Sequence, residues 1–155
     1  MQERRCARRS CLLLSGMARG TPSTDLSGPW SGVYNYPSRP QAEHFEAKLF
    51  DAGGAFTGTT HEIARLMQPQ PLDLRATLSG SHTAGEVRFV KTYDGSGGLA
   101  HSIDYTGSLS ADGDEIWGTW VLAWLRGTFL MIRQSPQSER IAEKRLAEVG
   151  ARTRT

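Results

Sequence analysis

Apolar and polar residues alternate with a period of two through the middle of the chain, in short runs separated by turn-forming residues. Successive side chains of a β-strand point to opposite faces, so this alternation predicts strands with one apolar and one polar face. The clearest pair is residues 115–122 and 127–133, with residues 123–126 as the predicted loop. The expected inward residues are Ile116, Gly118, Trp120 and Leu122 in the first strand, and Gly127, Phe129, Met131 and Arg133 in the second.

The same alternation predicts six earlier strands, at residues 29–37, 44–50, 55–63, 73–80, 86–93 and 101–109. Clusters of Gly, Asp and Ser mark turns at 51–54, 80–85, 94–98 and 111–114. Two prolines, Pro69 and Pro71, exclude a central strand from residues 64–72, because proline lacks the N–H that a sheet requires. This segment is either a lid over a barrel end or an ordinary surface loop.

Eight short strands joined mostly by brief turns predict an all-β protein, an antiparallel meander. Closing the meander into a barrel removes its two exposed edges, so an eight-stranded barrel is the expected fold. The expected inner face holds most of the aromatic residues: Trp30, Tyr34, Tyr36, Phe45, Phe56, Phe89, Tyr93, Tyr105, Trp120 and Phe129. Mid-strand glycines lie among them, which indicates bends or room beside a bulky ring.

Two short patterns resemble the calycin superfamily, the up-and-down barrels that include lipocalins and avidins. One is Gly28-x-Trp30 on the first strand together with Arg133 at the end of the last, and the other is Gly54-x-Phe56-Thr57-Gly58-Thr59. The resemblance implies that Trp30 packs across one end of the barrel and that Arg133 covers it, so both are expected to be structural. The body departs from lipocalins because it contains no cysteine, and therefore no disulfide.

The expected organisation is a disordered leader at residues 1–24, a barrel domain at 25–134, and a C-terminal helix or tail at 135–155 with a weakly amphipathic pattern. The leader contains both cysteines, Cys6 and Cys11, and Met17 is an alternative start. It only faintly resembles a signal peptide, so a cytoplasmic location is expected, with export as the alternative. No apolar run is long enough for a membrane span.

Charge is unevenly distributed along the chain. The formal net charge is +2, of which residues 1–20 contribute +4 and residues 134–155 contribute +2, leaving −4 on the body. A mildly acidic body argues against a nucleic-acid-binding face.

The inner face should be apolar, so its polar members are the candidates for chemistry. Glu62 and Lys91 are charged residues on that face, and a buried lone charge is so costly that each needs a partner. We expect them to pair with each other or with a ligand, in a cavity lined by Tyr34, Tyr93, Tyr105 and Trp120. The alternative is that Glu62 lies in water at its strand end and Lys91 extends to the rim.

The known catalytic, metal-binding and phosphate-binding motifs are incomplete or wrongly placed in this sequence. His61-Glu62 begins an HExxH motif, but Arg65 occupies the position of the second histidine. No spacing brings two of the histidines onto one strand face, so no metal site is expected, nor any cofactor. The glycine-rich turn at residues 94–98 precedes a strand, whereas phosphate-binding loops precede a helix.

The predicted function is binding of a small apolar or aromatic molecule inside the barrel. One alternative is a barrel filled by its own rings that serves as a structural or interaction module. A third reading is an enzyme that uses Lys91 or Glu62 as acid or base. An interior cavity of a few hundred cubic ångströms would favour the binding protein, since ligand pockets are about 300–1,000 Å³.

Overall fold

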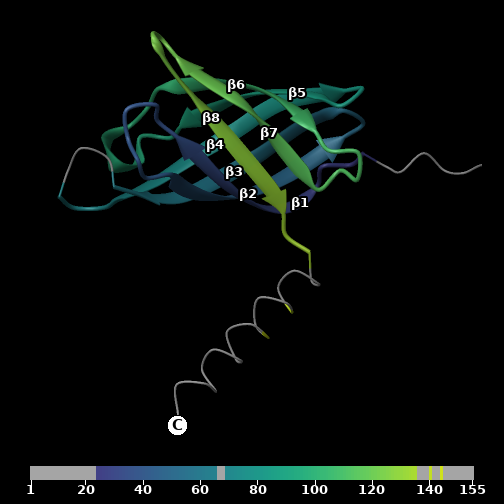
Figure 1. Cartoon of the computed structure of the whole chain (residues 1–155), viewed down its shortest axis with the longest axis horizontal. Helices are drawn as coiled ribbons and strands as arrows, with labels where there is room; N and C mark the ends of the chain where they lie inside the picture. The colour runs from purple at the N-terminus through teal and green to yellow at the C-terminus, as the bar shows by residue number, and fades with distance from the viewer. Residues whose placement is uncertain (1–23, 66–68, 136–139, 141–143, 145–155) are drawn as a thin grey trace, which may run out of the picture.

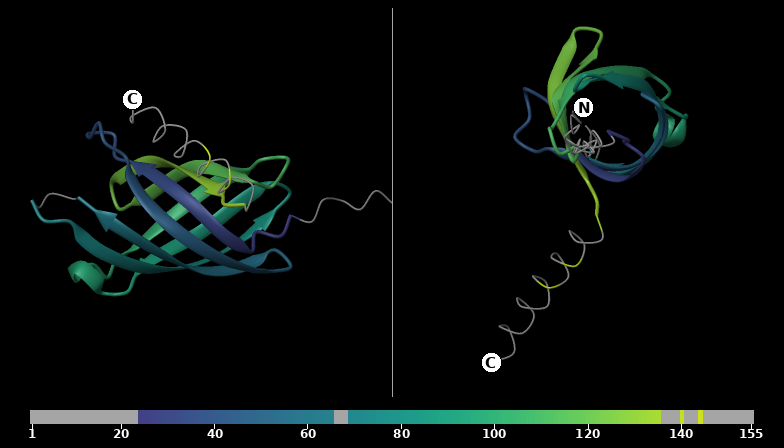
Figure 2. Two further views of the ribbon diagram at one scale, coloured as in Figure 1. Left: turned by 90° about the horizontal axis from the view of Figure 1, so that it is seen from below. Right: turned by 90° about the vertical axis from the view of Figure 1, so that its right-hand side faces the viewer.

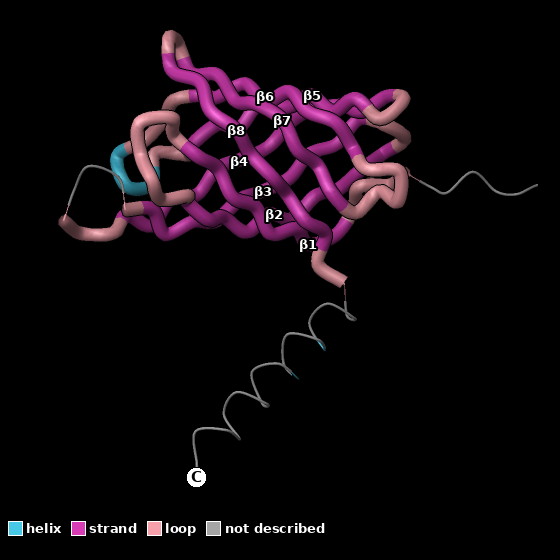
Figure 3. The backbone as a smooth tube through the Cα atoms, viewed as in Figure 1, coloured by secondary structure: helices cyan, strands magenta, loops and turns pink. Residues whose placement is uncertain are grey.

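The computed structural model describes residues 24–65, 69–135, 140 and 144. They form the predicted all-β fold, in which eight antiparallel strands close into a barrel in sequence order (Figure 1). The strands are β1 (Gly28–Asn35), β2 (Glu43–Ala52), β3 (Ala55–Ala64), β4 (Leu72–Thr83), β5 (Glu86–Tyr93), β6 (Ser102–Leu109), β7 (Glu115–Leu122) and β8 (Leu125–Arg133). A short 3-10 helix, η1 (Ser96–Gly98), lies in the β5–β6 connection (Figure 3).

The expected disordered leader lies outside the described residues apart from Thr24 at its end. The expected C-terminal helix also lies largely outside them, although Arg140 and Lys144 are helical and exposed. In the described part of the chain, no helix has the length and apolar character needed to cross a bilayer.

The first and last strands complete the ring. β1 pairs with β8 from Trp30 opposite Arg133 to Asn35 opposite Thr128, and β1 also pairs with β2. Figure 2 shows the resulting ring in cross-section, with every strand bonded to two neighbours. Closure therefore leaves no exposed sheet edge, as the number of strands and the short turns predict.

Two predicted turns are shorter in the structure, because a neighbouring strand extends into each of them. β4 continues to Thr83, so the predicted turn at residues 80–85 shrinks to residues 84–85. Ala84 and Gly85 both have positive φ, the conformation that tight two-residue hairpins require. Similarly, β8 begins at Leu125 rather than at 127, which leaves a two-residue connection after β7.

Aromatic rings fill much of the interior. Of the ten aromatic residues predicted to face inward, nine are buried, and Tyr36 is half-buried and packs against the core. Phe89 stacks on Tyr105 with ring centroids 4.6 Å apart, and Phe129 packs edge-on against both. The other three aromatics, Phe50, Trp117 and Trp124, are exposed. The alternation of the sequence therefore predicted the inner face correctly.

Mid-strand glycines make room for these rings. The Phe45 ring lies over Gly32, directly across the β1–β2 pair, so close that a Cβ on Gly32 would come 2.1 Å from Phe45 Cζ. Gly127 faces Trp120 across the β7–β8 pair, and a Cβ there would lie 2.5 Å from the indole ring and 2.0 Å from the Asn35 carbonyl oxygen. The predicted reason for the glycines, space beside a ring, holds at both positions.

The two ends of the barrel differ. One end, here called the loop end, carries the long connections at residues 36–42, 65–71 and 94–101 and the tight turn at 123–124. The other, the plugged end, carries the connections at 53–54, 84–85 and 110–114 and is entered by residues 25–27. Figure 1 shows the loop end at the left and the plugged end at the right.

Residues 25–27 cover the plugged end through several hydrogen bonds. Trp30 Nε1 donates to the carbonyl of Leu26 at 2.9 Å, and both side chains are fully buried. The guanidinium of Arg133 lies 4.6 Å from the Trp30 ring and donates to the carbonyls of Asp25 and Ser27. Arg133 thus connects the last strand to the segment that precedes the first.

We expect Gly127→Ala to destabilise the barrel by about 1–3 kcal/mol, because the added methyl group would overlap the Asn35 carbonyl and the Trp120 ring. Urea denaturation measures the effect. Thr128→Ala is the matched control, since Thr128 is the next residue of β8 and points outward, and its loss should cost less than about 1 kcal/mol. Equal stabilities of the two variants would contradict the packing account.

Candidate functional site

The two charged inward residues meet in the loop-end half of the barrel. Glu62 lies near the end of β3, and Lys91 and Tyr93 lie near the end of β5, so all three approach the same end. Lys91 Nζ donates to Glu62 Oε1 at 2.8 Å, and the hydroxyl of Tyr93 donates to the same oxygen at 2.5 Å. We call these three residues the Glu62 cluster. Neither charged side chain extends to water, because both are almost completely buried.

Aromatic rings surround the Lys91 ammonium group. Lys91 Nζ lies 5.3 Å from the ring centroid of Tyr34, 4.9 Å from that of Phe45 and 4.8 Å from that of Tyr93. The faces of aromatic rings carry partial negative charge and attract cations at these distances. The rings therefore replace part of the hydration that Lys91 loses on burial.

Burial shifts the pKa values of Lys91 and of the two neighbouring tyrosines. Burial lowers the pKa of Lys91, while the charge and hydrogen bond of Glu62 act in the opposite direction. Burial also raises the pKa of Tyr93 far above its ordinary value, and the nearby Tyr34 and Glu62 raise it further. The pKa of Tyr34 is raised for the same first reason, with Glu62 adding to it. Both phenols therefore stay protonated at neutral pH, and the Tyr93 hydroxyl donates its proton to the hydrogen bond with Glu62.

Three buried polar atoms have no hydrogen-bond partner among the described residues: Glu62 Oε2, Thr60 Oγ1 and Trp120 Nε1. Such atoms are uncommon in folded proteins, since leaving one unpaired costs about 1–3 kcal/mol. The carboxylate oxygen is the most costly of the three because it carries charge. A water molecule or a ligand group is the ordinary partner for atoms of this kind.

The structure brings most of the predicted site residues together. Tyr34 adjoins Lys91 and also packs edge-on against Trp120, with ring centroids 6.5 Å apart. Trp120 in turn packs against Tyr36 at 5.0 Å. Tyr105 differs from the others, because its ring belongs to the stack with Phe89 rather than to the Glu62 cluster.

Sequence reasoning missed two members of the site. Thr60 lies on the same face of β3 as Glu62, two residues earlier, and its buried hydroxyl was not among the predicted site groups. Phe45 was counted only as a core residue, although its ring is one of the three around Lys91. The alternation shows that both residues face inward, but it does not show which inward residues lie at the same height in a tilted barrel.

A second buried polar group, also missed, lies at the plugged end. Asp51 accepts hydrogen bonds from the backbone N–H groups of Leu26 and Gly54 and from Nε2 of His82. Asp51 and His82 were assigned to turns, whereas they lie inside β2 and β4 and their side chains are buried. Asp51 thereby holds Leu26 in place, so the Asp51–His82 pair belongs to the plugged end rather than to the candidate ligand site.

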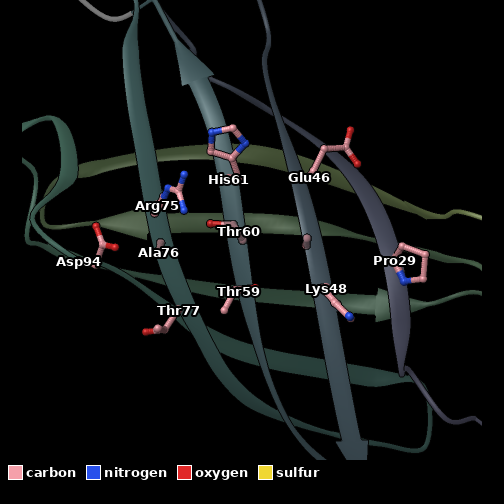
Figure 4. Close-up of a pocket in the computed structure, with 11 residues that line it drawn as sticks. Pro29, Glu46, Lys48, Thr59, Thr60, His61, Arg75, Ala76, Thr77 and Asp94 are labelled. Carbon is pink, nitrogen blue, oxygen red and sulfur yellow. The ribbon is translucent and has the colours of Figure 1, made fainter.

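The grooves on the barrel wall are separate from the Glu62 cluster. One groove of about 450 Å³ lies over β2, β3 and β4 and is lined by outward side chains that include Lys48, His61 and Arg75 (Figure 4). None of the six residues predicted to bind a ligand lines it. Among the described residues, no group of three or more His, Cys, Asp or Glu side chains is arranged to hold a metal ion.

Comparisons with known proteins give no family assignment. No protein-family model matches the chain, and no curated protein matches it significantly. The fold is nevertheless an all-antiparallel, up-and-down, closed barrel of eight strands, a topology consistent with the calycin resemblance.

We expect Lys91→Met to destabilise the protein by about 3–5 kcal/mol, because it leaves Glu62 as an uncompensated buried charge. The double variant Glu62→Gln/Lys91→Met should recover much of that loss, since neither residue is then charged. Urea denaturation of the two single variants and the double variant measures the coupling. Lys48→Met is the control, because Lys48 is exposed on β2, and it should change stability by less than about 0.5 kcal/mol. A double variant that is less stable than both single variants would contradict the pairing.

The Asp51 group predicts a loss of stability in acid. Burial acts to raise the pKa of Asp51, but the hydrogen bonds from Leu26, Gly54 and His82 outweigh it and lower the pKa overall. The folded state therefore gains stability above the unfolded-state pKa of about 4, and it loses that stability as the pH falls through the lower, folded-state value. Wild-type protein should lose more unfolding free energy than Asp51→Asn between neutral pH and about pH 3. Parallel pH dependences would rule out this contribution.

Proposed function

We propose that this protein binds a small, mostly apolar molecule in the loop-end half of its barrel, with the Glu62 cluster fixing the polar end of the ligand. The observation that carries the proposal is the free oxygen of Glu62. It is buried and charged, and it has no partner among the described residues, while the other oxygen of the same carboxylate accepts two hydrogen bonds.

The polar atoms around the cluster define what such a ligand offers. Glu62 Oε2 requires a hydrogen-bond donor, and Trp120 Nε1 requires an acceptor. Lys91 already balances the charge of Glu62, so a neutral ligand adds no uncompensated charge to the interior. A small number of polar groups in an otherwise apolar site is typical of sites that orient one small molecule.

The apolar part of the ligand would contact aromatic side chains. Tyr34, Tyr36 and Trp120 pack edge-on against one another beside the cluster. At the loop end, Leu72, Leu99, Leu122 and Leu125 are only partly buried against the core. This composition supports an aromatic or aliphatic ligand that enters between the loops. We also propose that the chain is a calycin-like barrel. The grounds are its closed up-and-down topology and the packing of Arg133 on Trp30.

A second candidate is a barrel filled by its own side chains that serves as a structural or interaction module. The ring stack of Phe89, Tyr105 and Phe129 favours it, because these side chains occupy the middle of the barrel in direct contact. Grooves of about 340–550 Å³ on the outer face of the barrel also favour it, because an interaction module contacts its partner through its outer surface. The two functions differ in whether the purified protein retains a small molecule.

Native mass spectrometry of the freshly purified full-length chain tests the proposal. We expect a species heavier than the polypeptide that returns to the polypeptide mass on denaturation. Glu62→Gln should weaken binding by about tenfold and so lower the occupied fraction, since a hydrogen bond to a charged group is worth about 1.5–3 kcal/mol. Glu86→Gln is the control, because Glu86 is exposed and pairs with Arg88 on the outer face.

A bare polypeptide mass, with no thermal shift in a screen of small metabolites, would favour the filled module. Equal occupancy in the Glu62→Gln and Glu86→Gln variants would place any retained molecule elsewhere on the protein.

A further inference from the structure

The chain contains only three lysine residues, and one of them is buried. The sequence contains Lys48, Lys91 and Lys144. Lys48 and Lys144 are exposed, whereas the side chain of Lys91 is 1% exposed and lies in the Glu62 cluster. A desolvated lysine amine is the form that attacks carbonyl groups in proteins. Lys91 therefore combines a nucleophilic atom with a site already proposed to hold a ligand.

We infer that Lys91 captures an apolar, conjugated aldehyde as a reversible imine, with Glu62 as the counterion of the protonated imine. This inference rests on the proposed interior binding site and names the ligand class of that site. The geometry that supports it is the position of Lys91 Nζ, 2.8 Å from Glu62 Oε1 and within 5.3 Å of three ring centroids.

The imine preserves the electrostatics that the fold already provides. A protonated imine keeps the positive charge of Lys91 and one N–H, and one N–H is what Lys91 donates to Glu62 in the structure. Its cation stays among the rings of Tyr34, Phe45 and Tyr93. Imine formation thus leaves Glu62 paired and creates no new buried charge, whereas a neutral amide at Lys91 would leave the carboxylate alone.

The reaction balances within the cluster and needs no oxidant or reductant. Lys91 transfers a proton to Glu62, and the free amine forms a bond to the carbonyl carbon of the aldehyde. The carbonyl oxygen takes up two protons that came from the ammonium group and leaves as water when the carbon–oxygen bond breaks. The products are one protonated imine and one water molecule, with Glu62 again a carboxylate. Burial lowers the pKa of Lys91, which favours the first proton transfer.

The surroundings of Lys91 favour an apolar and conjugated aldehyde over a sugar-like one. Aromatic side chains line the approach from the loop end, where Tyr34, Tyr36 and Trp120 pack beside the cluster. Tyr34 and Trp120 are almost completely buried, which limits the access of the bulk water that would otherwise hydrolyse the imine. Conjugation spreads the positive charge of the imine over the ligand, so the rings stabilise a larger part of it.

Borohydride trapping with cinnamaldehyde tests the inference on the full chain. The protein is incubated with one equivalent of the aldehyde and reduced with sodium borohydride, which converts the imine to a stable amine, and the adduct is mapped by tryptic peptides. We expect the adduct at Lys91, seen also as a missed cleavage after that residue, in wild-type protein and in Lys48→Arg. Lys91→Arg keeps the charge but forms no imine, and it should show no adduct at residue 91.

Absorption spectra provide a second readout that does not require a stable Lys91 variant. Bound cinnamaldehyde should give the long-wavelength band of a protonated imine in wild-type protein. Glu62→Gln should shift this band to the shorter wavelength of the unprotonated imine, because the counterion is lost. Glu86→Gln, altered only on the outer face, should leave the band unchanged.

Cinnamyl alcohol separates failure of this inference from failure of the proposed function, because it has the same shape and no carbonyl group. If native mass spectrometry shows the alcohol bound while the aldehyde gives no adduct at Lys91, the imine is ruled out and the binding function stands. Adducts confined to Lys48 and Lys144 overturn the inference as well. If neither the alcohol nor the aldehyde is retained, the inference is overturned, and the retained-molecule experiment above decides the binding function.

Discussion

The pairing of β1 with β8 is the constraint on which the rest of this barrel depends. It converts a meander with two exposed edges into a ring in which every strand has two neighbours. A closed ring of eight strands also fixes how much space its inner side chains must fill. Large rings therefore face glycines, as Phe45 faces Gly32 and Trp120 faces Gly127, since both cannot be bulky at one height.

Against this apolar interior, the Glu62 cluster is a costly feature that the fold offsets locally. Its ion pair, the hydroxyl of Tyr93 and the surrounding rings compensate for the lost hydration of two charges. Replacing a buried ion pair by apolar residues is often neutral or stabilising, so stability alone is a weak reason for its presence. A role in holding or reacting with a ligand gives the cluster a reason that packing does not.

Much of this architecture could be predicted from the sequence, because a period of two in side-chain polarity is a local property. Alternation identified the inner aromatics, and it placed Glu62 and Lys91 on the inner face. The energetic cost of a buried charge then limited their possible partners to each other or a ligand. Alternation does not give the height of a side chain along the barrel axis. Tyr93 lies two residues after Lys91 on β5, so the sequence places these two side by side. That the rings of Tyr34 and Phe45 also surround Lys91 depends on register and tilt across strands distant in sequence.

The length of the turns was the other feature that could not be predicted reliably from the sequence. The Gly- and Ser-rich stretch at residues 80–85 satisfied the rules for a loop, but only Ala84 and Gly85 form the turn. His82 was therefore interpreted as a turn residue. Asp51 was interpreted in the same way in the turn predicted at residues 51–54, so the buried pairing of the two was not predicted. Two residues that belong to different strand ends can only be paired once the register of β3 with both neighbours is known.

The location of both ends of the barrel domain at the plugged end has a practical consequence. Residues 25–27 enter there, and the chain leaves there after Arg133, where the backbone N–H of Gln134 bonds to the Pro29 carbonyl. A tag, linker or second domain attached before residue 25 or after Gln134 would therefore be attached at the opposite end of the barrel from the loop end. A molecule immobilised through either end would present its loop end to the solution. A short peptide that joins the two ends would also allow a circular permutant, with new termini in an exposed connection elsewhere.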